Sequence, residues 1–136
     1  MGLVLDTSIM IDAERRGLDA KQMLVGLALY KSAEFAVSAV SLVELTHGMV
    51  RARTEAVRRV RAGFLDDLRA AVPTIAVSDE IAIRAGELDG LLRQAGMTIG
   101  TADALIAATA LLSNYVVATS NFRHFKAVPG LEMVEL

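Results

Sequence analysis

The chain has no cysteine, only 2 prolines among its 136 residues, and few aromatic residues, at 4%. The absence of cysteine excludes disulfides, thiolate metal sites and a cysteine nucleophile, and it suits a reducing cytoplasm. The net charge of −2 argues against general, nonspecific binding of nucleic acid. No apolar run is long enough to span a membrane, and Asp6 interrupts the first apolar run early. We therefore expect a cytoplasmic protein that does not associate with membranes.

Hydrophobic side chains are abundant, and they make up 54% of the sequence. This content, in a chain of this length, is sufficient to build a single hydrophobic core. No repeat, low-complexity tract or proline-rich stretch marks a boundary between domains. We therefore predict one domain that comprises residues 1–136.

Short apolar or β-prone segments alternate with helical patterns along the chain. This alternation is typical of a mostly parallel sheet that is covered by helices on both faces. We therefore predict an α/β fold, a three-layer α/β/α sandwich with a mostly parallel sheet of about five strands. The strands are expected at residues 2–6, 34–38, 74–77, 115–119 and 131–134.

Apolar residues at helical spacing predict the helices. One helix is expected to begin near Ser78 and to end before Gly96. The stretch 51–69 holds six arginines and three acidic residues, and we interpret it as a solvated helix face with partial ion pairs. Three further helices carry stripes that should face the core: Leu42, Leu45 and Met49; Val57, Val60, Phe64 and Leu68; Ile106, Ala110 and Leu111.

Asp6 follows directly on the apolar run Leu3-Val4-Leu5. A strand this apolar should be buried on both faces, so a charge at its end requires an explanation. In open parallel sheets, ligands bind beyond the carboxyl ends of the strands, where Asp6 would lie. The simpler alternative is that Asp6 only caps the next helix, for which Thr7 and Ser8 also offer hydroxyl groups.

Two further carboxylates lie where a purely structural role is hard to assign. Glu44 falls in an apolar helical stretch without a cationic neighbour, and an unpaired charge buried there would be costly. Asp103 falls in the first turn of a helix for which Thr101 is a plausible N-cap. Because Asp103 continues the stripe that contains Ile106 and Ala110, it should point into a cleft rather than toward solvent.

Asn121 follows the strand predicted at 115–119. If that strand is parallel and adjacent to the first, then Asn121 and Asp6 emerge at the same sheet edge. Oxygen ligands without cysteine suit a hard cation such as Mg²⁺ or Mn²⁺, which would offset the charge of Asp6. We therefore predict a site made of Asp6, Glu44, Asp103 and Asn121. Ser8 and Thr119 are candidates to hydrogen-bond a ligand there, or simply to cap a helix and end a strand.

Taken together, these motifs resemble those of the PIN-domain ribonucleases, and most closely those of the VapC toxins of bacterial and archaeal VapBC toxin–antitoxin pairs. The resemblance covers essentially the whole chain. It is carried by Leu5-Asp6-Thr7-Ser8, by Glu44-Leu45 before Gly48, by IGTADALIAA from Ile99 to Ala108, and by Thr119-Ser120-Asn121 with His124-Phe125 behind it.

The resemblance implies a metal-dependent endoribonuclease that uses Mg²⁺ or Mn²⁺. It carries Asp6, Glu44 and Asp103 over as metal ligands and catalytic residues, whereas Asn121 stands where many PIN domains have aspartate. Since an amide adds no negative charge, we expect one metal ion rather than two. The partners that the resemblance implies are RNA, a cognate antitoxin that places an arginine or lysine among the carboxylates, and a second copy of the chain.

Two other classes of function remain open from the residues. An aspartyl-nucleophile phosphatase would also place an aspartate after the first strand, but it usually needs a second aspartate two residues later, where this chain has Ser8. A binding module without catalysis would use the arginines of 51–69 to contact RNA. Three carboxylates on three separate elements favour the nuclease.

Overall fold

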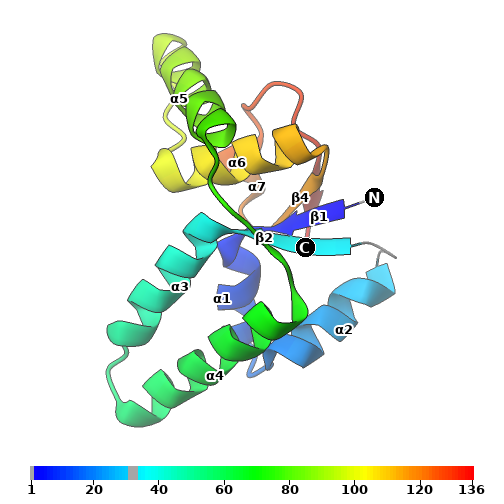
Figure 1. Ribbon diagram of the computed structural model, residues 1–136, viewed down its shortest axis with the longest axis vertical. Helices are drawn as coiled ribbons and strands as arrows, with labels where there is room; N and C mark the ends of the chain where they lie inside the picture. Colours follow the sequence, from blue (N-terminus) through cyan, green and yellow to red (C-terminus); the bar gives the residue numbers. More distant parts are fainter. Residues whose placement is uncertain (1, 31–33) are drawn as a thin grey trace.

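The computed structural model describes residues 2–30 and 34–136 (Figure 1). Within them, a parallel sheet with the strand order β3-β2-β1-β4-β5 lies between two groups of helices, which confirms the predicted α/β/α class. The strands are β1 (Gly2–Leu5), β2 (Glu34–Ser38), β3 (Thr74–Ile75), β4 (Val116–Thr119) and β5 (Met133–Glu135). The helices are α1 (Thr7–Arg15), α2 (Ala20–Tyr30), α3 (Ala39–Val50), α4 (Glu55–Ala71), α5 (Asp79–Gln94), α6 (Thr101–Ser113) and α7 (Phe122–Phe125).

Strand β1 is central in the sheet and is buried at all four positions. Leu3 pairs with Phe35 of β2 on one side and with Val116 of β4 on the other. The side chains alternate between the two faces of the sheet, as the pleat of a strand requires. Val4 joins the core under α5 and α6, whereas Leu5 joins the core under α1, α2 and α4. Because both faces of β1 pack against a core, its residues form a continuous apolar run.

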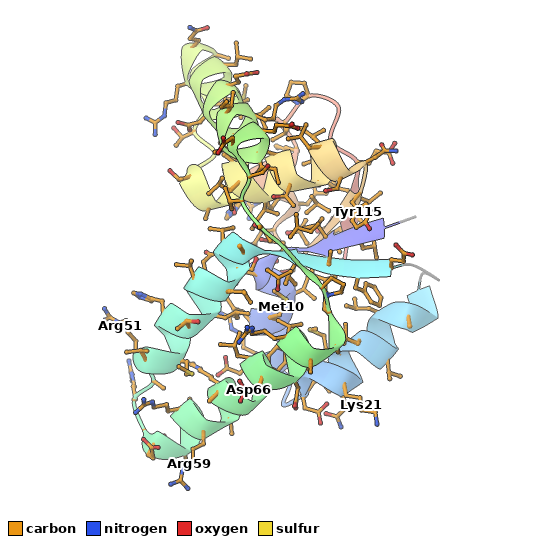
Figure 2. The ribbon with its side chains drawn as sticks, in the orientation of Figure 1. Met10, Lys21, Arg51, Arg59, Asp66 and Tyr115 are labelled. Atoms are coloured by element: carbon orange, nitrogen blue, oxygen red, sulfur yellow. The ribbon has the colours of Figure 1, made fainter. Side chains whose placement is uncertain are left out.

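The two cores lie on opposite faces of the sheet. Figure 1 shows α1 to α4 on one face and α5 and α6 on the other. Met10 of α1 points into the core under α1, α2 and α4 (Figure 2), and it is only 1% exposed. Ile106 of α6 lies in the second core and is fully buried.

Helix α4 differs from its sequence-based prediction. Leu68 is fully buried and Phe64 is partly buried against it, but Val57 and Val60 are 37% and 64% exposed. The reason is that the C-terminal part of α4 packs into the core with α2, while its N-terminal part runs beside α3 (Figure 1). Helical periodicity identifies the apolar face of a helix. It does not show how far along the helix that face is covered by the core.

Most other boundaries lie within one or two residues of the prediction, and β5 begins at Met133 rather than at residue 131. Strand β3 has two residues rather than four, and helix α5 ends at Gln94, two residues before Gly96, whose φ is +79°. No helix in the two described segments is both long and apolar enough to cross a membrane.

Candidate active site

The site begins where β1 and β4 end side by side. Leu5 pairs with Ala118, and the backbone N–H of Asp6 donates to the carbonyl of Ala118 at 2.9 Å. The predicted adjacency of these two parallel strands is therefore correct. It brings Asp6 next to Thr119 and the residues that follow β4.

Asp6 is 4% exposed, and two hydroxyl groups hold its carboxylate. Ser8 Oγ donates to Asp6 Oδ2 at 2.7 Å, and Thr119 Oγ1 donates to the same oxygen at 2.8 Å. Asp6 occupies the N-cap position of α1, but its side chain makes no capping hydrogen bond. The interpretation of Asp6 as a simple helix cap is therefore wrong, because its side chain is oriented by groups from two elements instead.

Glu44 enters the site from α3. Thr7 Oγ1 lies 2.7 Å from Glu44 Oε1 and 2.9 Å from Ser41 Oγ. Because a hydroxyl carries one hydrogen, Thr7 donates to the carboxylate and accepts from Ser41. Glu44 is exposed, so its predicted burial is wrong. Its link to the site is the contact with Thr7.

Asp103 lies in the first turn of α6, where 23% of its side chain is exposed. Burial raises the pKa of the Asp103 carboxyl, and the negative charges of Asp6 and Glu44 raise it further. The expected cap at Thr101 is wrong, because Gly100, with φ of +87°, is the N-cap residue and Thr101 is the first residue of the helix. A left-handed conformation of this kind favours glycine over threonine.

His124 of α7 contacts Asp103 and was not assigned to the site from the sequence. Its Nδ1 atom lies 3.1 Å from Asp103 Oδ2, and this contact lowers the pKa of Asp103 against the effects of burial and like charge. The signal in the sequence is weak: His124 follows Asn121 by three residues, the spacing of one helical turn.

Asn121 is exposed and occupies the N-cap position of α7, where its side chain makes no capping hydrogen bond. Its backbone N–H donates to Thr119 Oγ1 at 2.8 Å, and the backbone N–H of Ser120 donates to Ser8 Oγ at 3.1 Å. Ser8 and Thr119 therefore join the loop after β4 to the carboxylate of Asp6.

Asp6, Glu44, Asp103 and Asn121 line one open cavity of about 480 Å³. The structure thus brings together all four residues that the sequence indicated. No three acidic or histidine side chains of the described residues lie close enough to form a complete metal-binding cluster. The donor set nevertheless suits a hard cation, because it is rich in carboxylate oxygen and its negative charges already act on Asp103.

None of the arginines of 51–69 is among the described residues that line this cavity. Arg51 and Arg59 lie at the outer end of α3 and α4 (Figure 2), and Arg59 pairs with Glu55 at 3.5 Å within α4. Arg61 instead binds Glu14 at 2.8 Å and the carbonyl of Gly48 at 2.7 Å. The interpretation of this stretch as a solvated face with partial ion pairs is confirmed for Arg58 and Arg59, whose side chains are 55% and 81% exposed, but not for Arg61, which is 33% exposed.

Comparison with known proteins yields a consistent set of similarities. The PIN domain family pattern matches residues 3–131. Ribonuclease VapC1 of Rickettsia felis is 34% identical over 98% of this chain and 96% of its own length. Ribonuclease VapC of Rickettsia bellii is 33% identical over the same shares. A crystal structure of VapBC2 from Rickettsia felis, bound to a DNA fragment from its promoter, matches 100% of this chain and 99% of that chain, with a TM-score of 0.82 and 27% identity.

Proposed function

Because the chain belongs to the PIN-domain family and, within it, to the VapC ribonucleases, we propose that residues 1–136 act as one domain that cleaves RNA with the aid of a divalent metal ion. The observation that carries this proposal is the meeting of three carboxylates from separate elements in one cavity. Asp6 follows β1, Glu44 belongs to α3, and Asp103 belongs to α6.

Asp6 and Asp103 would hold one Mg²⁺ or Mn²⁺ ion directly, and Glu44 would hold it directly or through a water molecule. A bound ion of this kind activates water as a nucleophile and offsets charge that develops on the phosphodiester. Asn121 supplies an acceptor oxygen but no charge, so a second ion would bind weakly. The charge of this cavity supports a cation as its occupant.

The roles of the side chains follow from their surroundings. Ser8 and Thr119 fix the orientation of Asp6, so this ligand needs little reorganisation when an ion binds. Glu44 is exposed, and among the described residues its carboxylate accepts a hydrogen bond from Thr7 alone, so it can accept a proton from the attacking water. Asp103 binds a cation as the carboxylate, and its raised pKa moves the pH dependence of that binding upward from the ordinary range of an aspartate.

The test is RNA cleavage by the purified chain in the presence of Mg²⁺ or Mn²⁺. Asp6→Asn and Asp103→Asn should each reduce the rate by about 100-fold or more, because each removes a metal ligand. Asp66→Asn is the matched control, because Asp66 is an exposed residue of α4 away from the cavity. Cleavage by either site variant at the parental rate, under saturating metal, would refute the assignment.

The proposed partners are RNA as substrate and a cognate antitoxin as inhibitor, as the VapBC complexes among the structural relatives suggest. An arginine or lysine of the antitoxin would enter among Asp6, Glu44 and Asp103 and compete with the metal ion. Saturating antitoxin should therefore suppress cleavage, and the suppression should weaken as the metal concentration rises. We also propose a cytoplasmic location, because RNA and the antitoxin would both be present there.

We also propose that the chain forms a homodimer through an apolar helix surface. Ile83 and Leu91 lie two helical turns apart on α5, and each is 63% exposed. Leu91→Glu should convert the dimer into a monomer in sedimentation experiments. Val60→Glu on α4 is the control, because Val60 is equally exposed, at 64%, on a different helix. A parent chain that stays monomeric at high concentration would exclude the dimer.

A further inference from the structure

The cavity lined by Asp6, Glu44 and Asp103, here called the acidic cavity, must accept an anionic substrate although most of its charged side chains are negative. Besides the carboxylates already named, Asp12 of α1 also lines it. Among the described residues that line this cavity, Arg15 is the only arginine or lysine. A phosphodiester that approaches the site therefore meets one permanent positive charge on the protein.

Arg15 is free to bind such a phosphate. Its only ion pair with a described residue is with Asp12, at 3.8 Å, and the two side chains are 76% and 41% exposed. An exposed pair this long contributes little to stability, so exchanging it for a phosphate contact costs little. Arg16 is also exposed and forms no ion pair with a described residue.

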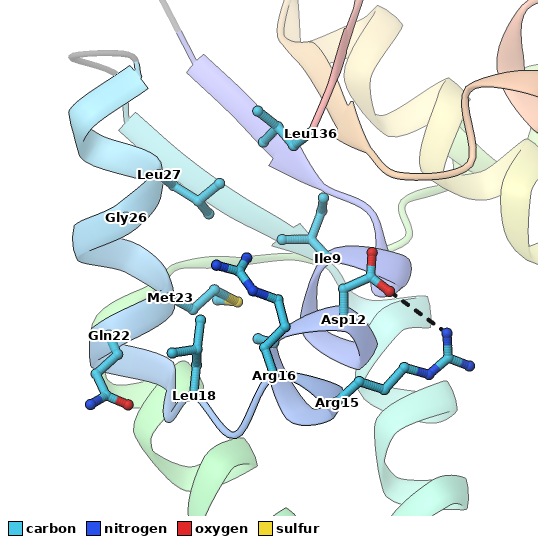
Figure 3. A pocket seen from close by; sticks show the side chains of 11 residues that line it. Ile9, Asp12, Arg15, Arg16, Leu18, Gln22, Met23, Gly26, Leu27 and Leu136 are labelled. Atoms are coloured by element: carbon cyan, nitrogen blue, oxygen red, sulfur yellow. Dashed lines mark ion pairs between the residues drawn. The ribbon is translucent and has the colours of Figure 1, made fainter.

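A groove of about 480 Å³ lies between α1 and α2, beside the acidic cavity. The buried side chains of Ile9, Met23 and Leu27 contribute to its apolar lining. Figure 3 shows the side chain of Arg16 extending over this groove, while Arg15 points the other way, toward Asp12. The volume of the groove lies within the range of about 300–1,000 Å³ that is usual for small-molecule sites.

The groove and the acidic cavity adjoin each other, because Asp12 and Arg15 line both. We propose that the groove between α1 and α2 binds the nucleotide next to the scissile phosphate of single-stranded RNA, with Arg15 on its phosphate and Arg16 stacked on its base. This subsite rests on the ribonuclease activity proposed above, and it gives that activity a means of holding the strand.

The chemistry of the groove favours a nucleotide. Unstacked RNA bases are commonly bound on aromatic rings or on the planar guanidinium of arginine. Aromatic residues make up only 4% of this chain, so arginine over an apolar floor is the available stacking surface. Arg15 lines both the groove and the acidic cavity, so its charge is placed to meet a phosphate between the bound base and the carboxylates.

The first experiment fills the groove without harming the fold. Gly26 of α2 lines the groove, and a Cβ atom added there would meet no other atom within 4 Å. Gly86 of α5 is equally open and lies outside the groove, so Gly86→Leu is the matched control. Both substitutions remove a glycine from a helix interior, which favours the helix. The binding of a fluorescently labelled, single-stranded RNA of random sequence is then measured by anisotropy in EDTA.

Gly26→Leu should weaken RNA binding by roughly 10- to 100-fold, as expected for the loss of one stacked base, whereas Gly86→Leu should bind like the parent. In cleavage assays the loss for Gly26→Leu should fall mainly on KM, because binding and not chemistry is affected. Equal RNA affinity for Gly26→Leu and Gly86→Leu would overturn the proposal. Loss of antitoxin binding alone in Gly26→Leu would also overturn it, because the groove would then hold a protein.

The second experiment tests the phosphate contact through its salt dependence. Arg15→Gln should reduce the slope of log affinity against log salt by about 0.7, the value for one phosphate contact on a single strand. Arg84→Gln removes an equal charge from an exposed position on α5 and should leave the slope unchanged. An unchanged slope for Arg15→Gln would refute the contact.

The two proposals fail in different ways. If the parent cleaves RNA and the groove variants bind RNA as the parent does, the subsite is wrong and the ribonuclease assignment stands. If the parent binds RNA through the groove but cleaves none with either metal ion, the binding site is supported and the ribonuclease assignment is refuted.

Discussion

Thr119 Oγ1 donates a hydrogen bond to Asp6 Oδ2 at 2.8 Å across 113 residues of sequence. The contact is possible because β1 and β4 are parallel neighbours that end at the same edge of the sheet. Thr119 is fully buried, and its hydroxyl also accepts from the backbone N–H of Asn121. One side chain therefore orients both a proposed metal ligand and the loop that carries Asn121.

Thr119→Val should weaken metal binding and lower stability, although valine has nearly the same shape as threonine. The variant keeps the volume of the side chain but leaves the buried Asp6 carboxylate with one hydroxyl donor, from Ser8. We expect Mn²⁺ affinity in calorimetric titration to fall by about 10- to 100-fold, because residues that orient a ligand affect affinity on this scale. The unfolding free energy in urea should fall by about 1–3 kcal/mol.

The control for this prediction is Thr109→Val. Thr109 is also fully buried, but its hydroxyl donates to the Leu105 carbonyl within α6 and lies outside the acidic cavity. This variant should lose stability without any change in metal affinity. If both valine variants bind Mn²⁺ equally well, Thr119 has only a structural role.

Asp103→Asn should stabilise the metal-free protein in a way that depends on pH. Burial raises the pKa of Asp103 in the folded state, and the charges of Asp6 and Glu44 act in the same direction. The folded protein then holds this proton more tightly than the unfolded chain, so stability is greatest below the ordinary pKa of 3.8 and falls as pH rises through the raised value. Asparagine has no such dependence.

Urea unfolding in EDTA at several pH values measures this effect. At neutral pH the Asp103→Asn variant should be more stable than the parent, and below pH 3.8 the difference should disappear. A difference in stability that is constant across this range would exclude carboxylate repulsion and burial as its cause. With metal present the order at neutral pH should reverse, because only the parent gains binding energy from the ion.

Thr7→Val tests how Glu44 is positioned. The variant removes the donor at 2.7 Å from Glu44 Oε1 and keeps the shape of the side chain. If Glu44 accepts the proton of the attacking water, kcat should fall by about 10- to 100-fold while KM changes little. Thr7→Ser should restore the rate, because serine supplies the same hydroxyl. Thr46→Val, at an exposed position on α3, is the control, and an equal kcat for Thr46→Val and Thr7→Val would remove Thr7 from the site.

The sequence predicted those parts of the fold that depend on burial along a strand. The run Leu3-Val4-Leu5 is apolar on both faces because it lies between β2 and β4 and under helices on each side. The same reasoning placed Asp6 and Asn121 at one edge, because the carboxyl ends of adjacent parallel strands meet there.

What the sequence did not predict depends on how the helices are rotated and where they end. Glu44 was expected to be buried, but α3 turns it outward, and only the structure reveals its contact with Thr7. The contact of His124 with Asp103 joins two helices through side chains 21 residues apart, and the spacing of His124 from Asn121 is only a weak indication of it. Thr101 has the hydroxyl of a typical cap, yet Gly100 takes that position through its positive φ.

Asn121→Asp tests whether the fourth position belongs to the metal site. Asn121 lines the cavity with Asp6 and Asp103, is exposed, and does not cap α7 with its side chain. An added carboxylate should tighten Mg²⁺ or Mn²⁺ binding by about tenfold, since ligand charge governs affinity for hard cations. It should also lower the stability of the metal-free protein, because it adds a like charge beside existing carboxylates.

Calorimetric titration of the metal ion into the parent and the variant measures the first effect, and urea unfolding in EDTA measures the second. Asn114→Asp is the control, because Asn114 lies at the far end of α6 and outside the cavity. Tighter metal binding in Asn121→Asp but not in Asn114→Asp would place position 121 among the ligands. Equal affinities in all three proteins would mean that the amide of Asn121 serves only the turn into α7, and that the ion is held by Asp6, Asp103 and Glu44 without it.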